Sequence, residues 1–348
     1  MTLTTECITL NKDRNVTLTA MLQRVDGELA IAKRPAIIIL PGGGYSVCSD
    51  REAEVVAYPF LSAGYDAFIL RYSVGEHKRW PNPLEDFDSA MEYILSNAEA
   101  FGIANDKIAV VGFSAGGHLA ASAITLAKHK PNAALLIYAA TEKKIAEACQ
   151  PGVDIPSPTD HISVDTPPCF IVAARDDTTV PMENQLRFMD ALDKNGVTFE
   201  CRIYSHGGHG FSTGLPSVAA EGISRRIPNW VSEGISFLED IFGKATANGF
   251  TAPVCPSHQN ANHEKYLSVH CTIAHVMKYS GESPELQALM RVIDSVVEAR
   301  FQNKELAMKI IGGYKLLELL GMLGKTKKEI EELDLKLREI KNDGRSCR

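Results

Sequence analysis

Residues Ile108–Ala127 read IAVVGFSAGGHLAASAITLA, and this stretch decides the fold of the chain. It opens with a run of branched apolar residues, passes through a glycine-flanked turn around Ser114, and continues into a segment with helical spacing. A short run rich in Ile and Val is typical of a strand that is buried on both faces. The stretch therefore predicts a strand, a tight turn and a helix, with Ser114 at the bend.

Ser114 stands at the centre of a G-x-S-x-G motif, Gly112-Phe113-Ser114-Ala115-Gly116. In the strand–turn–helix setting this motif places its serine in a strained conformation, with the hydroxyl projecting from the edge of the sheet. Glycines on either side are needed because neighbouring chains would clash with side chains there. The positive end of the following helix also favours an anion that develops nearby. We therefore predict that Ser114 is a nucleophile.

Strands and helices alternate on both sides of this motif. Apolar runs predict strands at residues 36–40, 67–72, 108–111, 134–138, 169–173 and 198–204, after an antiparallel hairpin over 7–24. Helical patterns lie at 51–63, 84–101, 116–129, 182–195 and 221–242. This order is typical of an α/β fold with a mostly parallel central sheet and helices on both faces. Residues 141–167 carry no strong pattern and predict a short cap or loop.

A glycine run follows the first of the parallel strands, in Pro41-Gly42-Gly43-Gly44-Tyr45. Acyl transfer needs backbone N–H groups aimed at the developing oxyanion, and glycine lets the main chain approach a substrate closely. We expect an oxyanion hole formed by the N–H groups of Gly43 or Gly44 and of Ala115. A plain turn is the alternative reading of the same glycines.

Candidates for an acid and a base follow the last two predicted strands. Asp176 and Asp177 come after the first of these strands, and His206 and His209 stand among glycines after the second. A buried carboxylate can hold an imidazole in one tautomer and stabilise its protonated form. Glycines around a histidine let a loop carry the ring over the nucleophile. These residues predict a catalytic triad with Ser114.

These motifs resemble bacterial α/β-hydrolase esterases of the acetyl-xylan esterase type. The resemblance rests on PGGGYSVCSDREAE, FILRYSV, GFSAGGHLA, DTPPCFIVAARDDTTVP and HGGHGF, and it covers about residues 5–243. It implies the α/β-hydrolase fold, in which the triad follows the chain order serine, acid, histidine. It also implies hydrolysis of short acyl esters, such as acetyl groups on plant-derived oligosaccharides, at a site that uses no metal or other cofactor.

The family pattern distinguishes between the paired candidates. It places the acid shortly before a Val-Pro pair, which favours Asp177, and it places the base in Gly-His-Gly-Phe, which favours His209. Asp176 is then expected to brace the turn, and His206 to line the pocket or end the strand. His118 projects from the helix behind Ser114, which is the wrong element for the base.

Three further residues are candidates for contact with the substrate. Tyr45 can form a pocket wall, with core packing as the alternative. Arg51 can flank the pocket mouth together with Glu52, although a solvated helix start is an equal alternative. Trp80 can stack on a sugar or leaving group, although a packed loop residue is the simpler reading.

The sequence changes character after about residue 245. We predict a catalytic domain at 1–245, a linker at 246–262 and an all-helical C-terminal domain of unknown role at 263–348. Helical patterns there lie at 263–280, 284–301, 303–323 and 326–342. Amphipathic packing explains the last of these, and a homo-oligomer contact through the C-terminal helices is the second reading. Cys271 and His275 could share one helical face, but the spacing fits no standard zinc pattern, so we predict no metal.

The composition and charge of the chain argue against some classes of binding partner. A net charge of −7 argues against nucleic acid, and no apolar run approaches the roughly 20 residues that span a membrane. The N-terminal residues lack the pattern of a signal peptide, so we expect a cytoplasmic protein whose eight cysteines are reduced thiols. The expected partner is a small-molecule ester. A peptidase of the prolyl-oligopeptidase type and a non-catalytic binding module remain the alternatives.

Overall fold

The computed structural model describes residues 2–24, 31, 33–300 and 302–342. The chain divides into two compact units, with the boundary between Ser257 and His258. Each unit has its own hydrophobic core. The fold and the site can therefore be described within the first unit.

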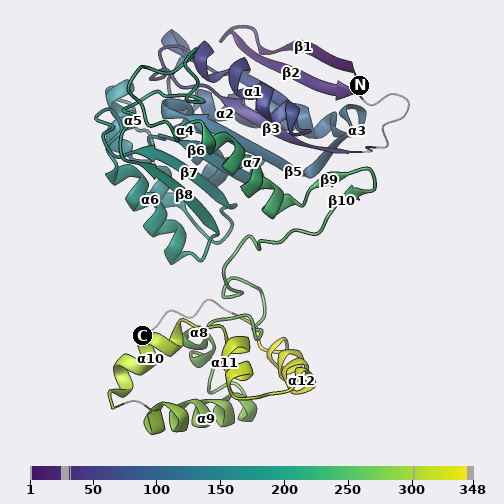
Figure 1. The fold of residues 1–348 in the computed structure, drawn as a ribbon, viewed down its shortest axis with the longest axis vertical. Coiled ribbons are helices and arrows are strands. Elements are labelled where there is room, and N and C mark those ends of the chain that lie inside the picture. The colour runs from purple at the N-terminus through teal and green to yellow at the C-terminus, as the bar shows by residue number, and fades with distance from the viewer. Residues whose placement is uncertain (1, 25–30, 32, 301, 343–348) are drawn as a thin grey trace. The chain divides into compact units, whose positions relative to one another are not determined.

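An eight-stranded sheet forms the centre of the first unit, in the order β1-β2-β4-β3-β5-β6-β7-β8 (Figure 1). The strands are β1 (Thr2–Asn11), β2 (Val16–Arg24), β3 (Arg34–Leu40), β4 (Asp66–Arg71), β5 (Ile103–Phe113), β6 (Ala133–Ile137), β7 (Cys169–Ala174) and β8 (Phe199–Tyr204). The β1–β2 hairpin is antiparallel, and β2 joins β4 antiparallel. All neighbours from β4 to β8 are parallel, so their carboxyl ends meet at one edge of the sheet.

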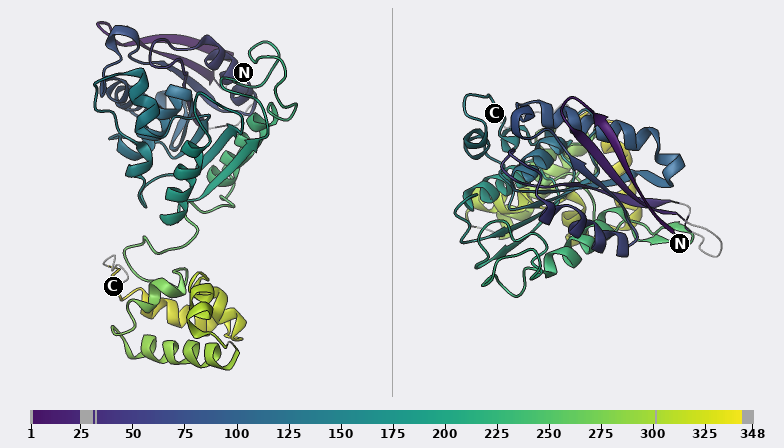
Figure 2. Two further views of the ribbon diagram at one scale, coloured as in Figure 1. Left: turned by 90° about the vertical axis from the view of Figure 1, so that its left-hand side faces the viewer. Right: turned by 90° about the horizontal axis from the view of Figure 1, so that it is seen from above.

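Helices cover both faces of this sheet (Figures 1 and 2). They are α1 (Glu54–Ser62), α2 (Asn82–Ser96), α3 (Ala98–Phe101), α4 (Ser114–Leu126), α5 (Lys143–Cys149), α6 (Glu183–Lys194) and α7 (Asn229–Phe242). Phe87 of α2 and Leu119 of α4 pack into the core on one face, while Phe60 of α1 and Trp230 of α7 pack into the core on the other. This arrangement confirms the mostly parallel α/β architecture predicted from the sequence.

Local differences from the predicted elements have visible causes. The helix predicted over 221–242 begins only at Asn229, because Gly222 has a φ of 82° and Pro228 disfavours helix in the residue before it. The unpatterned segment 141–167 contains α5. Short 3₁₀ turns occur at η1 (Asp50–Glu52), η2 (Gly75–His77) and η3 (Pro158–His161).

The predicted linker 246–262 is partly structured. It overlaps a small hairpin, β9 (Ala245–Thr246) with β10 (Gly249–Phe250). Further along, the Thr198 N–H donates to the carbonyl oxygen of Ser257 at 3.0 Å. The chain therefore stays attached to the first unit beyond the expected boundary at residue 245.

The second unit consists of helices, as the sequence predicts, but with different bounds. They are α8 (Ile273–Met277), α9 (Pro284–Arg300), α10 (Lys304–Gly312), α11 (Leu316–Met322) and α12 (Lys327–Leu337). The helix expected over 263–280 is wrong for its first half, because Tyr266 pairs with Lys341 in an extended bridge. The helix expected over 303–323 is divided where Lys315 pairs with Thr272. Among the described residues, no helix is long and apolar enough to cross a membrane.

Candidate active site

Ser114 lies at the sharp turn between β5 and α4. Its φ of 52° falls in the left-handed region that side chains rarely adopt. The flanking glycines permit this turn: a Cβ on Gly112 would lie 2.3 Å from the Gly116 carbonyl oxygen, and a Cβ on Gly116 would lie 2.1 Å from that of Leu40. The G-x-S-x-G spacing is therefore required by close backbone packing.

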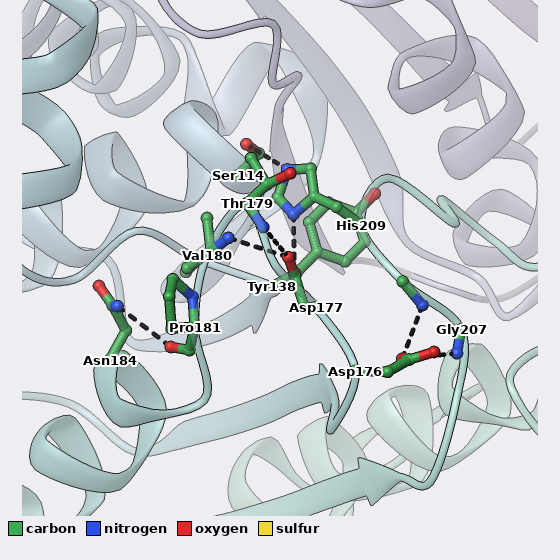
Figure 3. A network of polar contacts seen from close by, with 12 residues as sticks. Ser114, Tyr138, Asp176, Asp177, Thr179, Val180, Pro181, Asn184, Gly207 and His209 are labelled. Atoms are coloured by element: carbon green, nitrogen blue, oxygen red, sulfur yellow. Dashed lines mark hydrogen bonds and ion pairs between the residues drawn. The ribbon is translucent and has the colours of Figure 1, made fainter.

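Three side chains from three loops meet at the carboxyl edge of the sheet (Figure 3). Ser114 Oγ lies 2.8 Å from His209 Nε2, and His209 Nδ1 lies 2.7 Å from Asp177 Oδ2. The Asp177 side chain is 2% exposed, whereas the imidazole is 21% exposed. With the Nδ1 proton donated to the carboxylate, Nε2 is free to accept the proton of the serine hydroxyl. The arrangement can therefore transfer a proton from Ser114 to His209.

The second carboxylate oxygen of Asp177, Oδ1, is also hydrogen-bonded. Oδ1 accepts the backbone N–H groups of Thr179 and Val180, each at 2.9 Å. Both carboxylate oxygens are thus occupied, one by the turn and one by His209. This fixes the carboxylate in the orientation that meets the imidazole.

The alternative candidates Asp176 and His206 lie apart from this chain of contacts. Asp176 is exposed and accepts the N–H groups of Gly207 and Gly208, each at 2.9 Å (Figure 3). The Gly208 N–H is the main cause that lowers the pKa of Asp176. His206 is exposed and contacts Ser205. Asp176 therefore braces the loop that carries the His209 ring without touching it.

A cavity of about 280 Å³ opens beside Ser114 and His209. The predicted oxyanion-hole residues Gly43, Gly44 and Ala115 all line it. Its apolar wall is made largely by α5 and neighbouring loops, through Ala140, Ile145, Ala146, Cys149 and Val180. The segment 141–167 thus closes one side of the pocket without forming a separate lid domain.

Tyr45 lines the cavity and is fully buried. Its hydroxyl donates to His118 Nδ1 at 2.7 Å, and His118 Nε2 donates to the Pro156 carbonyl oxygen at 3.0 Å. Burial lowers the pKa of His118 to about 4, which keeps this imidazole neutral. His118 therefore joins the pocket wall to the cap, and both of its ring nitrogens are engaged by residues other than Ser114.

Trp80 and Arg51 have different positions relative to the cavity. Trp80 is not among the described residues that line it; its ring packs edge-on against His118, with centroids 5.4 Å apart. The stacking role predicted for Trp80 therefore has no support in the pocket geometry. Arg51 is exposed and lines the pocket, and its Nη1 donates to the Val218 carbonyl oxygen at 3.1 Å.

Tyr138 was not singled out from the sequence, whereas Glu52 was considered beside Arg51 at the pocket mouth and does line the cavity. Glu52 is only 3% exposed, so the solvated helix start considered for it is wrong. Its carboxylate accepts the Gly42 N–H at 2.8 Å and the Tyr138 hydroxyl at 2.6 Å. The Tyr138 oxygen also accepts the Ser212 N–H at 3.0 Å, and its ring lies edge-on to His209 with centroids 5.0 Å apart.

This buried pair joins the glycine loop to the loop that carries the base. Burial, reinforced by the negative charge of Glu52, raises the pKa of Tyr138 well above its usual value, so the phenol keeps its proton. One signal was available in the sequence: Tyr138 follows a parallel strand, at the edge where Ser114 is expected. Nothing comparable marks Glu52.

The polar residues of the C-terminal region do not gather into a metal site. Within the described ranges there is no group of three or more His, Cys, Asp or Glu residues arranged to hold a metal ion. The Cys271 thiol contacts the Ala261 carbonyl oxygen, whereas His275 contacts Asn342. Cys271 also precedes α8, so the shared helical face considered for it and His275 does not form.

Sequence comparison identifies relatives among esterases and other hydrolases. Residues 28–151 match the family model described as BD-FAE. The chain is 31% identical over 214 residues to endo-1,4-beta-xylanase B of Butyrivibrio fibrisolvens, covering 52% of this chain and 33% of that protein. It is 28% identical over 199 residues to an acetylxylan esterase of Xylanibacter ruminicola, covering 51% and 41%. The chain therefore spans well under half the length of these curated relatives.

Solved structures match about two thirds of this chain over nearly their own whole length. MGS-M1, an α/β-hydrolase enzyme from a Medee basin deep-sea metagenome library, is 38% identical with a TM-score of 0.64, and the match covers 69% of this chain and 98% of that one. An acetyl ester-xyloside bifunctional hydrolase from Caldicellulosiruptor lactoaceticus is 27% identical with a TM-score of 0.60, covering 68% and 96%. The 38% identity over nearly the whole of MGS-M1 shows that this chain belongs to the α/β-hydrolase family, within which its residues 28–151 match the model described as BD-FAE.

Proposed function

We propose that the chain is a serine carboxylic-ester hydrolase that cleaves short-chain acyl esters through an acyl-enzyme intermediate. The observation that carries the proposal is the continuous contact from Ser114 through His209 to the buried Asp177, beside a cavity lined by backbone of the glycine loop. A nucleophile, a base and an orienting carboxylate in this order are the parts that acyl transfer needs.

In the first half of the reaction, His209 Nε2 takes the proton of Ser114 as the oxygen attacks the ester carbonyl carbon. The N–H groups of Gly43 or Gly44 and of Ala115 stabilise the oxyanion, and one such donor contributes about 3 kcal/mol. The carbon–oxygen bond to the alcohol then breaks, and the departing oxygen takes the proton from His209. Asp177 stabilises the imidazolium throughout.

In the second half, water replaces the alcohol. His209 takes a proton from this water as it attacks the acyl carbon, and the bond to Ser114 Oγ breaks. Ser114 recovers its proton from His209, and the carboxylic acid leaves. The residues present supply every proton transfer in this cycle.

The shape of the site favours a small acyl group. Since the alcohol oxygen must face His209 to receive a proton, the acyl group lies on the opposite side, toward the wall formed by Ile145, Ala146 and Cys149. The Cys149 thiol lies only 3.8 Å from the position of a Cβ on Gly44, directly over the glycine loop. We expect a higher kcat/KM for p-nitrophenyl acetate than for p-nitrophenyl octanoate. The reverse order would contradict a small acyl pocket.

Acetylated oligosaccharides are the proposed natural substrate class. The support is the naming of relatives as an acetylxylan esterase and as an acetyl ester-xyloside hydrolase. Release of acetate from acetylated xylo-oligosaccharides, compared with release from simple alkyl acetates, tests this choice.

Labelling with a fluorophosphonate probe tests the enzyme against the alternatives. We expect the wild-type chain to be labelled and Ser114→Ala to remain unlabelled. Absence of labelling in the folded wild type would favour a binding module. Labelling together with cleavage of prolyl peptides, and not of esters, would favour a peptidase.

A further inference from the structure

A guanidinium group stands at the mouth of the pocket, next to the base. Arg51 lines the same cavity as Ser114 and His209. A Cβ on Gly210 would lie 3.6 Å from Arg51 Nη2, so the guanidinium lies beside the residue that follows His209. The bond from Nη1 to the Val218 carbonyl oxygen fixes one arm of the group. The remaining N–H groups are therefore held in a defined position at the mouth.

The charge of Arg51 is not neutralised by an ion pair. In the part of the chain that the structure describes, no carboxylate lies within ion-pair distance of it, whereas the nearby Arg71 is paired with both Asp50 and Glu54. The neighbouring Glu52 carboxylate is buried and committed to Gly42 and Tyr138. Arg51 therefore brings an exposed positive charge to the pocket of a chain with a net charge of −7.

The position of Arg51 relates it to one half of the substrate. During acyl transfer the departing alcohol oxygen must face His209, because it receives the imidazole proton. The alcohol part of an ester therefore lies along His209 and Gly210, where Arg51 is found. The acyl part lies on the other side, against α5. Arg51 can contact the alcohol part without touching the acyl group.

We propose that Arg51 selects esters whose alcohol part carries a carboxylate, such as acetylated sugars of the uronic acid class. This inference rests on the proposed esterase function. The planar guanidinium presents paired N–H donors that match the two oxygens of a carboxylate, and one arm is already fixed by Val218. Neutral acetylated sugars offer no group that would use this charge.

A matched pair of probes tests the proposal on the full-length chain. The probes are 4-acetoxybenzoate and its methyl ester, which place a carboxylate or a neutral group on the same leaving phenol. The quantity measured is the ratio of kcat/KM for the charged probe to that for the neutral probe. We expect Arg51→Gln to lower this ratio about tenfold, in the range for an exposed hydrogen bond to a charged group. Arg51→Lys should retain part of the preference for the charged probe, because lysine keeps the positive charge but lacks the paired N–H donors of the guanidinium.

Both probes are measured on the same sample, so a loss of folded protein cancels in the ratio. Arg24→Gln is the control, because it also removes one positive charge from an exposed position. Arg24 ends β2, and because β2 runs antiparallel to β4, this end lies at the amino edge of the parallel strands, opposite the edge that carries Ser114. It should leave the ratio at the wild-type value. The wild-type ratio should also fall with rising NaCl concentration, because salt screens exposed charges.

The outcomes separate this inference from the proposed function. Wild-type hydrolysis of both probes, with a ratio that Arg51→Gln does not change, would overturn the role of Arg51 and leave the esterase intact. An equal drop of the ratio in Arg24→Gln would assign the effect to net charge and overturn it as well. If the wild-type chain hydrolyses none of the three esters, that is, neither of the two probes nor p-nitrophenyl acetate, the proposed esterase function and the inference are both overturned.

Discussion

The two edges of the eight-stranded sheet bury polar groups in different ways. At the carboxyl edge, Ser114, His209 and Asp177 form a continuous chain of hydrogen bonds beside a cavity. At the amino edge, Asp66 is fully buried at the start of β4, and its Oδ1 accepts the Gln23 N–H at 2.7 Å. Its other oxygen accepts no hydrogen bond from any residue that the structure describes.

This comparison shows that burial alone does not identify a carboxylate as part of a catalytic site. Burial raises the pKa of Asp66 from 3.8 to about 6, yet no hydroxyl or imidazole of the described residues forms a hydrogen bond with it. Asp177 is also buried, but both of its oxygens are bonded and one of them meets His209. The carboxyl edge is therefore expected to govern rate, and the amino edge to govern stability.

The largest expected effect separates two adjacent aspartates at the carboxyl edge. Asp177→Asn should lower kcat for p-nitrophenyl acetate by about 10⁴-fold, because an amide no longer holds the imidazole in the reactive tautomer. Asp176→Asn is the matched control, and we expect a far smaller loss, because an amide oxygen can still accept the N–H groups of Gly207 and Gly208. Similar losses in both variants would contradict the roles assigned here.

A smaller effect is expected from the buried pair that joins the two catalytic loops. Glu52→Ala should lower kcat/KM about 10²-fold, the scale of an ångström-size displacement of groups that act on the substrate. The loss should fall mainly on kcat, because Gly42 leads into the oxyanion loop and Tyr138 packs on His209. We expect Glu52→Gln to recover part of the rate, because its carbonyl oxygen can still accept the Gly42 N–H.

Glu54→Ala is the control for this experiment, because Glu54 lies close by in α1 but pairs with Arg71 at the surface. A Glu52→Ala protein with a lowered melting temperature and an unchanged kcat would restrict Glu52 to a structural role. The steady-state parameters and the thermal unfolding curve of each variant decide between these two roles.

Short-range patterns were sufficient to predict much of the carboxyl edge. A strand followed by glycine, serine or histidine can be recognised within ten residues, and parallel strands bring such ends together. Ser114 was expected on this basis, together with a pair of candidates for the acid and a pair for the base. The family pattern favoured Asp177 and His209, and the structure brings these two into contact with Ser114. Most helices and strands of the first unit were recognisable for the same reason, whereas α5 lies in the segment 141–167, which carries no strong pattern.

Features that depend on long-range contacts could not be predicted in this way. The role of Glu52 depends on Tyr138, which lies 86 positions away in the chain. Residues 263–272 have helical spacing, but they form turns and bends, with an isolated bridge between Tyr266 and Lys341. The sequence left Trp80 between stacking on a substrate and the simpler reading of packing in a loop, and its contact with His118 agrees with the second. In each case the deciding partner is distant in sequence.

The smallest of these effects concerns the amino edge. Asp66→Asn should raise the free energy of unfolding at pH 7.5 by about 1–2 kcal/mol. A shift from 3.8 to about 6 corresponds to roughly 3 kcal/mol at 1.36 kcal/mol per unit, and this net value already includes the attraction to Arg34. The amide NH2 that replaces Oδ2 is buried without an acceptor among the described residues, and its desolvation offsets part of the gain. Urea unfolding of the wild type, Asp66→Asn and the exposed control Asp165→Asn measures this difference.

The direction of the pH dependence makes this prediction specific to ionisation. The pKa of Asp66 is higher in the folded chain than the ordinary 3.8, so the folded state binds more protons between pH 3.8 and about 6. The contribution of Asp66 to stability is therefore fully present below pH 3.8 and is lost as the pH rises through about 6. The advantage of Asp66→Asn over the wild type should shrink as the pH is lowered from 7.5 toward 4. If the difference in the free energy of unfolding between Asp66→Asn and the wild type stayed constant across this range, the effect would come from packing of the amide. Ionisation of Asp66 would then not distinguish the amino edge from the carboxyl edge.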